Sequence, residues 1–114
     1  MNLDNLKNLT EEYIQAFDNK DINSLKALLT EGFILEDPVV QKVVGRDNAL
    51  IKILEIFNGS ENLSFKAKNI FQERNTTIIE FVLTLDDVIL KGVDILDWEQ
   101  YKIKQLRAYL DIPK

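Results

Sequence analysis

Asp94 is a carboxylic acid in the middle of an otherwise apolar strand face. Residues 90–98 alternate, and Asp94 falls on the same face as Leu96 and Trp98. Burial on this face would raise the pKa of Asp94, and a neutral acid can donate a hydrogen bond to a developing oxyanion. The alternative is a structural aspartate that bonds a neighbouring side chain or faces a dimer partner. A neutral Asp94 in a dry cavity would favour catalysis, whereas a salt bridge would favour the structural role.

Asp37 and Tyr13 are the other two candidates for proton chemistry. Asp37 precedes Pro38, which disfavours helical dihedrals at Asp37 and indicates a strand end or a turn. It could bond nearby backbone in a turn, or it could act as a general base at a pocket rim. Glu36 is the weaker candidate, because alternation points it to the opposite face. Tyr13 lies on an apolar helical stripe, where it is either core filler or directs its hydroxyl into a cavity.

Composition narrows the chemistry that this chain of 114 residues can perform. The chain has no Cys and no His, which excludes thiolate nucleophiles, imidazole acid–base catalysis and the usual zinc ligands. The sequence has no Gly-rich phosphate loop and no ligand cluster, so we expect no metal, nucleotide or flavin cofactor. Proton transfer must then depend on Asp, Glu, Lys or Tyr.

Charge and hydropathy exclude two classes of partner. Fourteen Lys and Arg against nineteen Asp and Glu give a net charge of −5, and the basic residues form no run. A nucleic-acid partner is therefore not expected. An acid occurs early, at Asp4, without an apolar signal-peptide core, and no apolar run approaches the roughly 20 residues of a membrane helix. We expect a cytoplasmic protein without membrane contact.

Three helices are predicted in the first half of the chain. Apolar residues at steps of three and four predict helices over residues 3–18, from residue 22 to near Gly32, and over 48–57. Asp47 is the expected N-cap of the third helix. The apolar side of that helix is expected to consist of Leu50, Ile51, Leu54 and Phe57.

Extended structure is predicted before the third helix and throughout the second half of the chain. A short extended piece covers residues 33–36, and beyond residue 60 the apolar period changes to two. This change predicts four antiparallel strands, over residues 63–72, 76–85, 88–98 and 102–110. Separate helices and strands favour one α+β domain over residues 1–114, with helices packed on one face of a curved sheet. The mouth of such a cone is a natural pocket for a small molecule.

Each face of the predicted sheet has its own expected role. The candidates to line an apolar cavity are Leu54, Phe57, Phe81, Leu83, Trp98, Leu106 and Leu110. The opposite face would carry an apolar patch of Ile78, Val82, Ile89, Val93 and Ile95. Because such a patch is unfavourable in water, we expect a homodimer through this outer face.

Taken together, the candidate residues lie in phrases typical of a known superfamily. The order of elements and the phrases Tyr13-Ile14-Gln15-Ala16-Phe17, Glu36-Asp37-Pro38-Val39 and Leu106-Arg107-Ala108 resemble the nuclear transport factor 2-like superfamily. Within it, the chain resembles the SnoaL-like branch and the ketosteroid isomerases over nearly its whole length. The resemblance implies a cystatin-like cone with three N-terminal helices on a curved, mainly antiparallel sheet.

The resemblance also implies roles for the three candidates. By analogy with the ketosteroid isomerases, Tyr13 and a protonated Asp94 would form an oxyanion hole, and Asp37 would move the proton. Lys91 and Asp97 flank Asp94 but should point to the other face. The absence of His argues against the chemistry of SnoaL-type cyclases and scytalone dehydratases. The limonene epoxide hydrolases need an Arg in the cavity, which Arg107 supplies only if its strand turns it inward.

Two functional hypotheses follow. The first is a cofactor-free acid–base isomerase, acting on a small apolar carbonyl compound of the kind that ketosteroid isomerases use. The second is a non-catalytic module of the same fold that binds a small ligand or mediates dimerisation.

Overall fold

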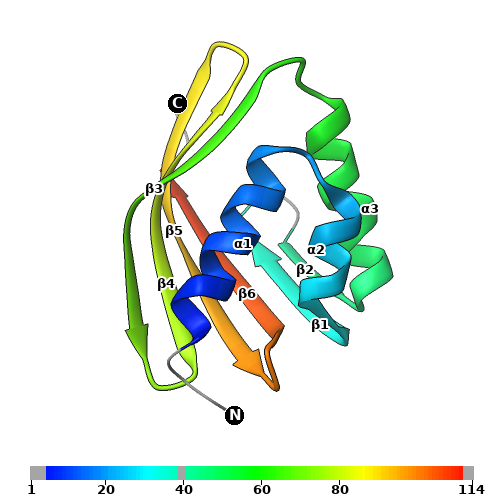
Figure 1. Ribbon diagram of the computed structural model, residues 1–114. Coiled ribbons are helices and arrows are strands. Elements are labelled where there is room, and N and C mark those ends of the chain that lie inside the picture. Colours follow the sequence, from blue (N-terminus) through cyan, green and yellow to red (C-terminus); the bar gives the residue numbers. More distant parts are fainter. Residues whose placement is uncertain (1–4, 39–40, 112–114) are drawn as a thin grey trace.

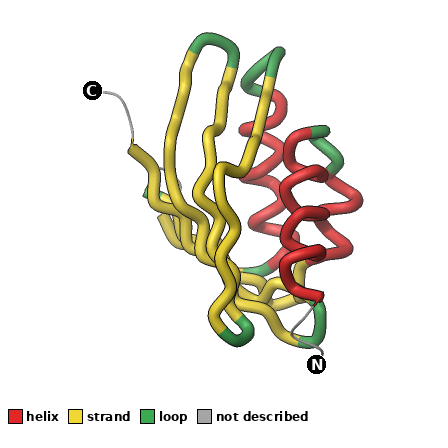
Figure 2. Tube along the Cα trace, turned by 60° about the vertical axis from the view of Figure 1, so that its left-hand side comes forward, coloured by secondary structure: helices red, strands yellow, loops and turns green. Residues whose placement is uncertain are grey.

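The computed structural model describes residues 5–38 and 41–111, so Val39 and the predicted helix start at residue 3 lie outside it. In chain order the elements are α1 (Leu6–Asp18), α2 (Ile22–Leu28), β1 (Leu29–Asp37), β2 (Gln41–Val44), α3 (Arg46–Asn58), β3 (Leu63–Glu73), β4 (Thr76–Leu85), β5 (Val88–Glu99) and β6 (Lys102–Asp111). The three helices lie together on one side of the sheet, with α1 crossing the β3 end and α3 lying beside β1 and β2 (Figures 1 and 2).

The strands form one mixed sheet in the order β2-β1-β6-β5-β4-β3. From β3 to β6, successive strands pair in antiparallel fashion, as the alternation predicts. β1 then lies parallel to β6, and β2 pairs antiparallel to β1 at the sheet edge. Register shifts within β3–β4 and β5–β6 accompany the curvature of the sheet, because an extra residue bends a strand. β6 and β5 are the two central strands of the sheet.

The second helix is shorter than predicted, and β1 is longer. α2 ends at Leu28, and Leu29 is already extended, with φ −107° and ψ 141°. Leu29 pairs with Ile103 of β6, and its side chain is buried, so sheet pairing takes this residue from the helix. The predicted stop at Gly32 is therefore wrong, because this glycine lies inside β1.

The third helix begins two residues earlier than predicted and buries a different face. Its N-cap is Gly45, whose φ of +100° favours glycine, whereas Asp47 lies in the first turn. The buried residues of α3 are Ala49, Leu50, Ile53 and Phe57, while Ile51 and Leu54 are exposed. Residues 49–57 are apolar on nearly every side of the helix, so their pattern does not select one face.

A buried chain of hydrogen bonds ties α1 to the sheet at the closed end of the fold. The indole nitrogen of Trp98 donates a hydrogen bond to the Thr77 hydroxyl at 2.8 Å. The oxygen of the Thr77 hydroxyl in turn lies 2.8 Å from that of the Thr10 hydroxyl. The Thr10 hydroxyl is 2.7 Å from the carbonyl oxygen of Leu6. Each hydroxyl has one proton, so all three bonds form together when Thr77 donates to Thr10 and Thr10 to Leu6. All four residues are fully buried, and the chain fixes α1 against β4 and β5.

Within the described residues, no helix has both the length and the apolar character needed to cross a membrane.

Candidate active site

The pairing of β1, β6 and β5 brings Asp37 and Asp94 to the same region of the sheet. Asp94 lies directly opposite Ala108 of β6, and Glu36 of β1 lies opposite Arg107. Asp37 follows Glu36 and so lies beside Ala108, with the two aspartates on either side of it. Two strand spacings separate the aspartate backbones by roughly 10 Å, and Ala108 has only a methyl group to occupy the space between them.

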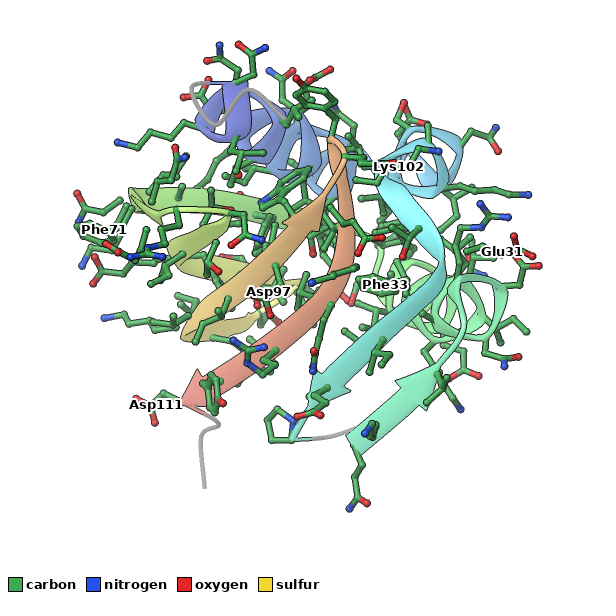
Figure 3. The ribbon with its side chains drawn as sticks, turned by 90° about the horizontal axis from the view of Figure 1, so that it is seen from below. Glu31, Phe33, Phe71, Asp97, Lys102 and Asp111 are labelled. Carbon is green, nitrogen blue, oxygen red and sulfur yellow. The ribbon has the colours of Figure 1, made fainter. Side chains whose placement is uncertain are left out.

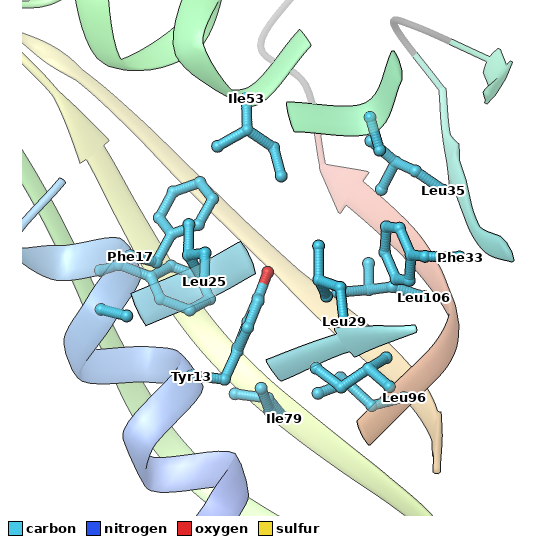
Figure 4. Packing of buried hydrophobic residues seen from close by; sticks show 14 of the residues in the cluster. Tyr13, Phe17, Leu25, Leu29, Phe33, Leu35, Ile53, Ile79, Leu96 and Leu106 are labelled. Atoms are coloured by element: carbon cyan, nitrogen blue, oxygen red, sulfur yellow. The ribbon is translucent and has the colours of Figure 1, made fainter. Parts of the chain in front are cut away.

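Tyr13 reaches the same region from the helix layer. It lies one turn after Thr10 on α1, which the Thr77 bond fixes against the sheet. In the core, the Tyr13 hydroxyl points into the space bordered by Leu25, Leu29 and Ile53 (Figure 4). The Tyr13 ring packs edge-on against Phe65, with 6.2 Å between the ring centroids.

A cavity of about 220 Å³ lies between the helices and the sheet. Tyr13, Asp37 and Asp94 all line it, so the structure brings the three candidates together. Its other walls are four phenyl rings and aliphatic side chains: Phe17, Leu25, Leu29, Phe33, Leu35, Ile53, Ile56, Phe65, Phe81, Leu83, Leu85, Leu90, Leu106, Ala108 and Leu110. A largely apolar cavity with a few convergent polar groups is the usual form of a small-molecule site.

Of the seven apolar residues expected to line the cavity, four do so: Phe81, Leu83, Leu106 and Leu110. The others, Leu54, Phe57 and Trp98, do not. Leu54 lies on the exposed side of α3, and Phe57 packs behind the wall against Phe17, with 5.0 Å between the ring centroids. Trp98 lies four residues beyond Asp94 on the same face of β5, beneath the cavity.

The cavity has a closed end and a mouth along β5. Below Asp94, Leu96 and Trp98 are fully buried and block the closed end. Above Asp94, Gly92 and Leu90 lead to a partly exposed rim. Asp94 at 5% exposure and Tyr13 at 4% therefore lie in the enclosed part. Asp37 is half-buried and also lines a more open groove of about 520 Å³, which places its carboxyl between the cavity and solvent.

Burial and like charge control the protonation of the enclosed groups. Burial, and secondly the negative charge of Asp37, raise the pKa of Asp94 to about 8. Burial, followed by the charges of Asp94 and Asp37, raises the pKa of the Tyr13 hydroxyl well above its ordinary value. No Lys or Arg is present among the described lining residues, so no cation counters either effect. At neutral pH both Asp94 and Tyr13 carry a proton that they can donate.

Arg107 does not enter the cavity. Its guanidinium donates to the Asp97 carboxylate at 2.6 Å, and Asp97 also accepts from the Thr76 hydroxyl, on the face away from the helices. In Figure 3, Asp97 lies on β5, and Phe71 lies on β3 and faces outward. Phe33 and Glu31 lie on β1, on the other side of the sheet from β3. The Asp-Arg-Asp arrangement of the limonene epoxide hydrolases is therefore not formed in this cavity.

Sequence reasoning identified Asp37 but missed Phe33 and Leu35 of β1 as cavity residues. Phe33, Leu35 and Asp37 are alternate residues of one strand, and all three line the cavity. Phe33 and Leu35 lie in the extended piece predicted over residues 33–36, so alternation with Asp37 could have identified them. Among the described residues, no group of three or more Asp, Glu, His or Cys side chains could hold a metal ion.

The fold and its enclosed cavity define a class of small α+β proteins. Comparison with known families shows to which family of that class the chain belongs. The model of the SnoaL-like domain matches residues 10–106, and the chain belongs to this family. No match was found among the curated proteins.

Solved structures with this fold are numerous, and their sequences are distant. A nuclear transport factor 2-like protein of unknown function from Burkholderia xenovorans is 18% identical, with a TM-score of 0.83 over 97% of this chain and 86% of that one. A protein with a ketosteroid isomerase-like fold from Catenulispora acidiphila, in complex with trimethylamine, is 14% identical, with a TM-score of 0.78 over 89% and 83%. An LEH-like epoxide hydrolase of Mycobacterium tuberculosis is 16% identical, with a TM-score of 0.76 over 91% and 80%. At these identities the similarity shows the fold alone.

Proposed function

We propose that this protein is a cofactor-free acid–base isomerase of a small apolar ketone. The observation that supports this proposal is the convergence of Tyr13, Asp37 and Asp94 on one apolar cavity whose described walls carry no cation. Two protonated donors, Tyr13 and Asp94, face a carboxylate that borders solvent. This is the complement that enolisation of a ketone needs.

In the proposed reaction, a β,γ-unsaturated ketone binds with its carbonyl oxygen between Tyr13 and Asp94. Asp37 takes a proton from the carbon between the carbonyl and the double bond, and the C–H electron pair moves into a dienolate. Hydrogen bonds from Tyr13 and Asp94 stabilise the oxygen as it gains charge, each contributing roughly 3 kcal/mol to lowering the barrier. Asp37 then returns the proton to the γ-carbon, which gives the conjugated enone with no net change in atoms.

The test is conversion of β,γ-unsaturated ketones to conjugated enones, followed by ultraviolet absorbance. Asp37→Asn should slow conversion by about 10²- to 10⁴-fold, the usual contribution of a general base. Glu36→Gln is the matched control, because Glu36 is the adjacent carboxylate on the opposite face and should leave the rate unchanged. Equal losses in both variants, or none in Asp37→Asn, would contradict the role of Asp37.

The non-catalytic alternative is a binding module for a small alkylammonium ion. Five aromatic rings and two carboxyls surround the cavity, an arrangement that favours organic cations through charge and cation–π attraction. Calorimetry with trimethylammonium tests it: tight binding that is lost in both Asp37→Asn and Asp94→Asn, together with no enone formation, would favour this alternative.

We also propose that two copies pair through the sheet face opposite the helices. Ile78 lies opposite Ile95 on this face, and the exposed Phe71 and Tyr109, which sequence reasoning did not include, extend the same apolar surface. Ile89 is exposed at the rim. Light scattering should give twice the monomer mass at micromolar concentration, and a monomer would contradict the pairing.

A further inference from the structure

Two side chains pack over the backbone of Gly92, which lies two residues before Asp94 on the same strand. A Cβ placed on Gly92 would lie 2.9 Å from Cζ of Phe81 and 3.1 Å from Cδ2 of Leu110. It would also meet the carbonyl oxygen of Tyr109. Phe81 and Leu110 therefore approach the bare backbone of Gly92 from the neighbouring strands on either side. Since Gly92 lies between Asp94 and the rim on the same strand face, these two side chains form a constriction between the mouth and the donor groups.

The space below the constriction is small. The whole cavity measures about 220 Å³, less than the roughly 300–1,000 Å³ of pockets for drug-sized ligands. It equals the liquid volume of roughly seven water molecules, at ~30 Å³ each. A six-membered ring ketone, with about seven non-hydrogen atoms, fits at the packing density of a protein interior, of about 0.75. A steroid ketone has about three times as many atoms, so most of its skeleton would have to pass between Phe81 and Leu110 or displace them.

The charges around the cavity restrict the ligand further. Asp37 and Asp94 are both acids, and no Lys or Arg lines the cavity in residues 5–38 and 41–111. A carboxylate or phosphate on the ligand would be buried without a cationic partner and beside the acidic side chains, which is strongly unfavourable. The cavity therefore disfavours anions, and under the isomerase function its substrate is an uncharged ketone.

We propose that Phe81 and Leu110 determine specificity by admitting uncharged single-ring ketones to the donors and excluding skeletons of steroid size. The proposal rests on the isomerase function and gives its substrate class. Leu110 is the residue to change, because it is half-buried near the end of β6 and its truncation opens the constriction at modest cost in stability. Leu85 provides the matched control, since it also lines the cavity near the mouth but is not one of the two side chains at Gly92.

The experiment measures kcat/KM for cyclohex-3-en-1-one and for a β,γ-unsaturated 3-ketosteroid in three proteins: wild type, Leu110→Ala and Leu85→Ala. Wild type should prefer the cyclohexenone by at least tenfold. Leu110→Ala should raise the ratio of kcat/KM for the steroid to kcat/KM for the cyclohexenone at least tenfold. Leu85→Ala should leave the wild-type preference in place. Equal use of both ketones by wild type, or the same preference in Leu110→Ala as in wild type, would overturn the proposal.

Ligand-observed NMR with cyclohexanone and a saturated 3-ketosteroid separates this proposal from the isomerase function. If no protein converts either ketone, the isomerase function fails. The proposed exclusion of steroid-sized ligands by Phe81 and Leu110 then still holds if wild type binds only cyclohexanone and Leu110→Ala binds the steroid as well. It is overturned if wild type binds the steroid, or if cyclohexanone does not bind.

Discussion

Replacing Asp94 by Asn should remove a pH dependence of stability that the cavity builds into this protein. The folded-state pKa of Asp94 is about 8, and that of an exposed aspartate is about 3.9. Between these values the folded chain holds one proton more than the unfolded chain, so the free energy of unfolding falls as pH rises. Below about pH 4 both states are protonated, and above about pH 8 both are ionised, so the contribution is constant outside this window.

The slope has a defined size. One proton corresponds to about 1.4 kcal/mol for each pH unit, or on the order of 3 kcal/mol between pH 5 and 7.5. Asn has nearly the shape of protonated Asp but does not titrate. The unfolding free energy of Asp94→Asn minus that of wild type should therefore increase by this amount over the same interval. Titrations elsewhere in the chain contribute equally to both proteins and cancel.

Urea denaturation at several pH values measures this difference, with fluorescence of the single tryptophan as the signal. Trp98 is fully buried, so its emission reports loss of the native core. Asp37→Asn provides a second comparison: the charge of Asp37 is the secondary cause of the raised pKa, so the window for Asp94 should then close at lower pH. A difference between wild type and Asp94→Asn that stays constant from pH 5 to 7.5 would contradict a raised pKa of Asp94 in the folded protein.

Two further substitutions test the closed end and the floor of the cavity. Thr77→Val leaves the buried indole nitrogen of Trp98 and the Thr10 hydroxyl without their shared partner and should cost roughly 1–3 kcal/mol in urea denaturation; a loss below about 0.5 kcal/mol would contradict the hydrogen-bond chain. Gly92→Ala brings a methyl group against the Tyr109 carbonyl oxygen and should lower the free energy of unfolding by roughly 1–3 kcal/mol, as overpacking does, and a thermal midpoint equal to wild type would contradict that contact.

Apolar periodicity in the sequence predicted the strands that pair with the next strand along the chain. The strands over residues 76–85, 88–98 and 102–110 agree with the structure to within a residue, because hairpin pairing and alternation are both local. β2 was not predicted: it has four residues, is mostly exposed and pairs only with β1, so it has no apolar alternation to detect. The buried face of α3 was predicted incorrectly because the helix is apolar on almost all sides.

The candidate site combines local signals with one pairing that no local pattern contains. Asp94 stands out in the sequence, since a carboxylic acid on an apolar strand face is unusual. Its position relative to Asp37 depends on the parallel pairing of β1 with β6, strands that are more than 60 residues apart in the chain. Periodicity within either strand cannot reveal that pairing. The phrases resembling the nuclear transport factor 2-like superfamily were what linked the three candidates before the structure did.

The parallel pairing of β1 with β6 also explains how the carboxyls of Asp37 and Asp94 can have different roles in the proposed reaction. Asp37 lies where β1 borders the open groove, and a carboxylate near water keeps its charge at lower cost than one enclosed by apolar side chains. Asp94 lies on the central strand β5, above the plug formed by Leu96 and Trp98, where burial keeps its proton in place. The negative charge on Asp37 further favours the neutral form of Asp94, which is the form that the proposed reaction needs. A larger residue at Ala108 would fill the space between them, where the ketone must lie to meet both.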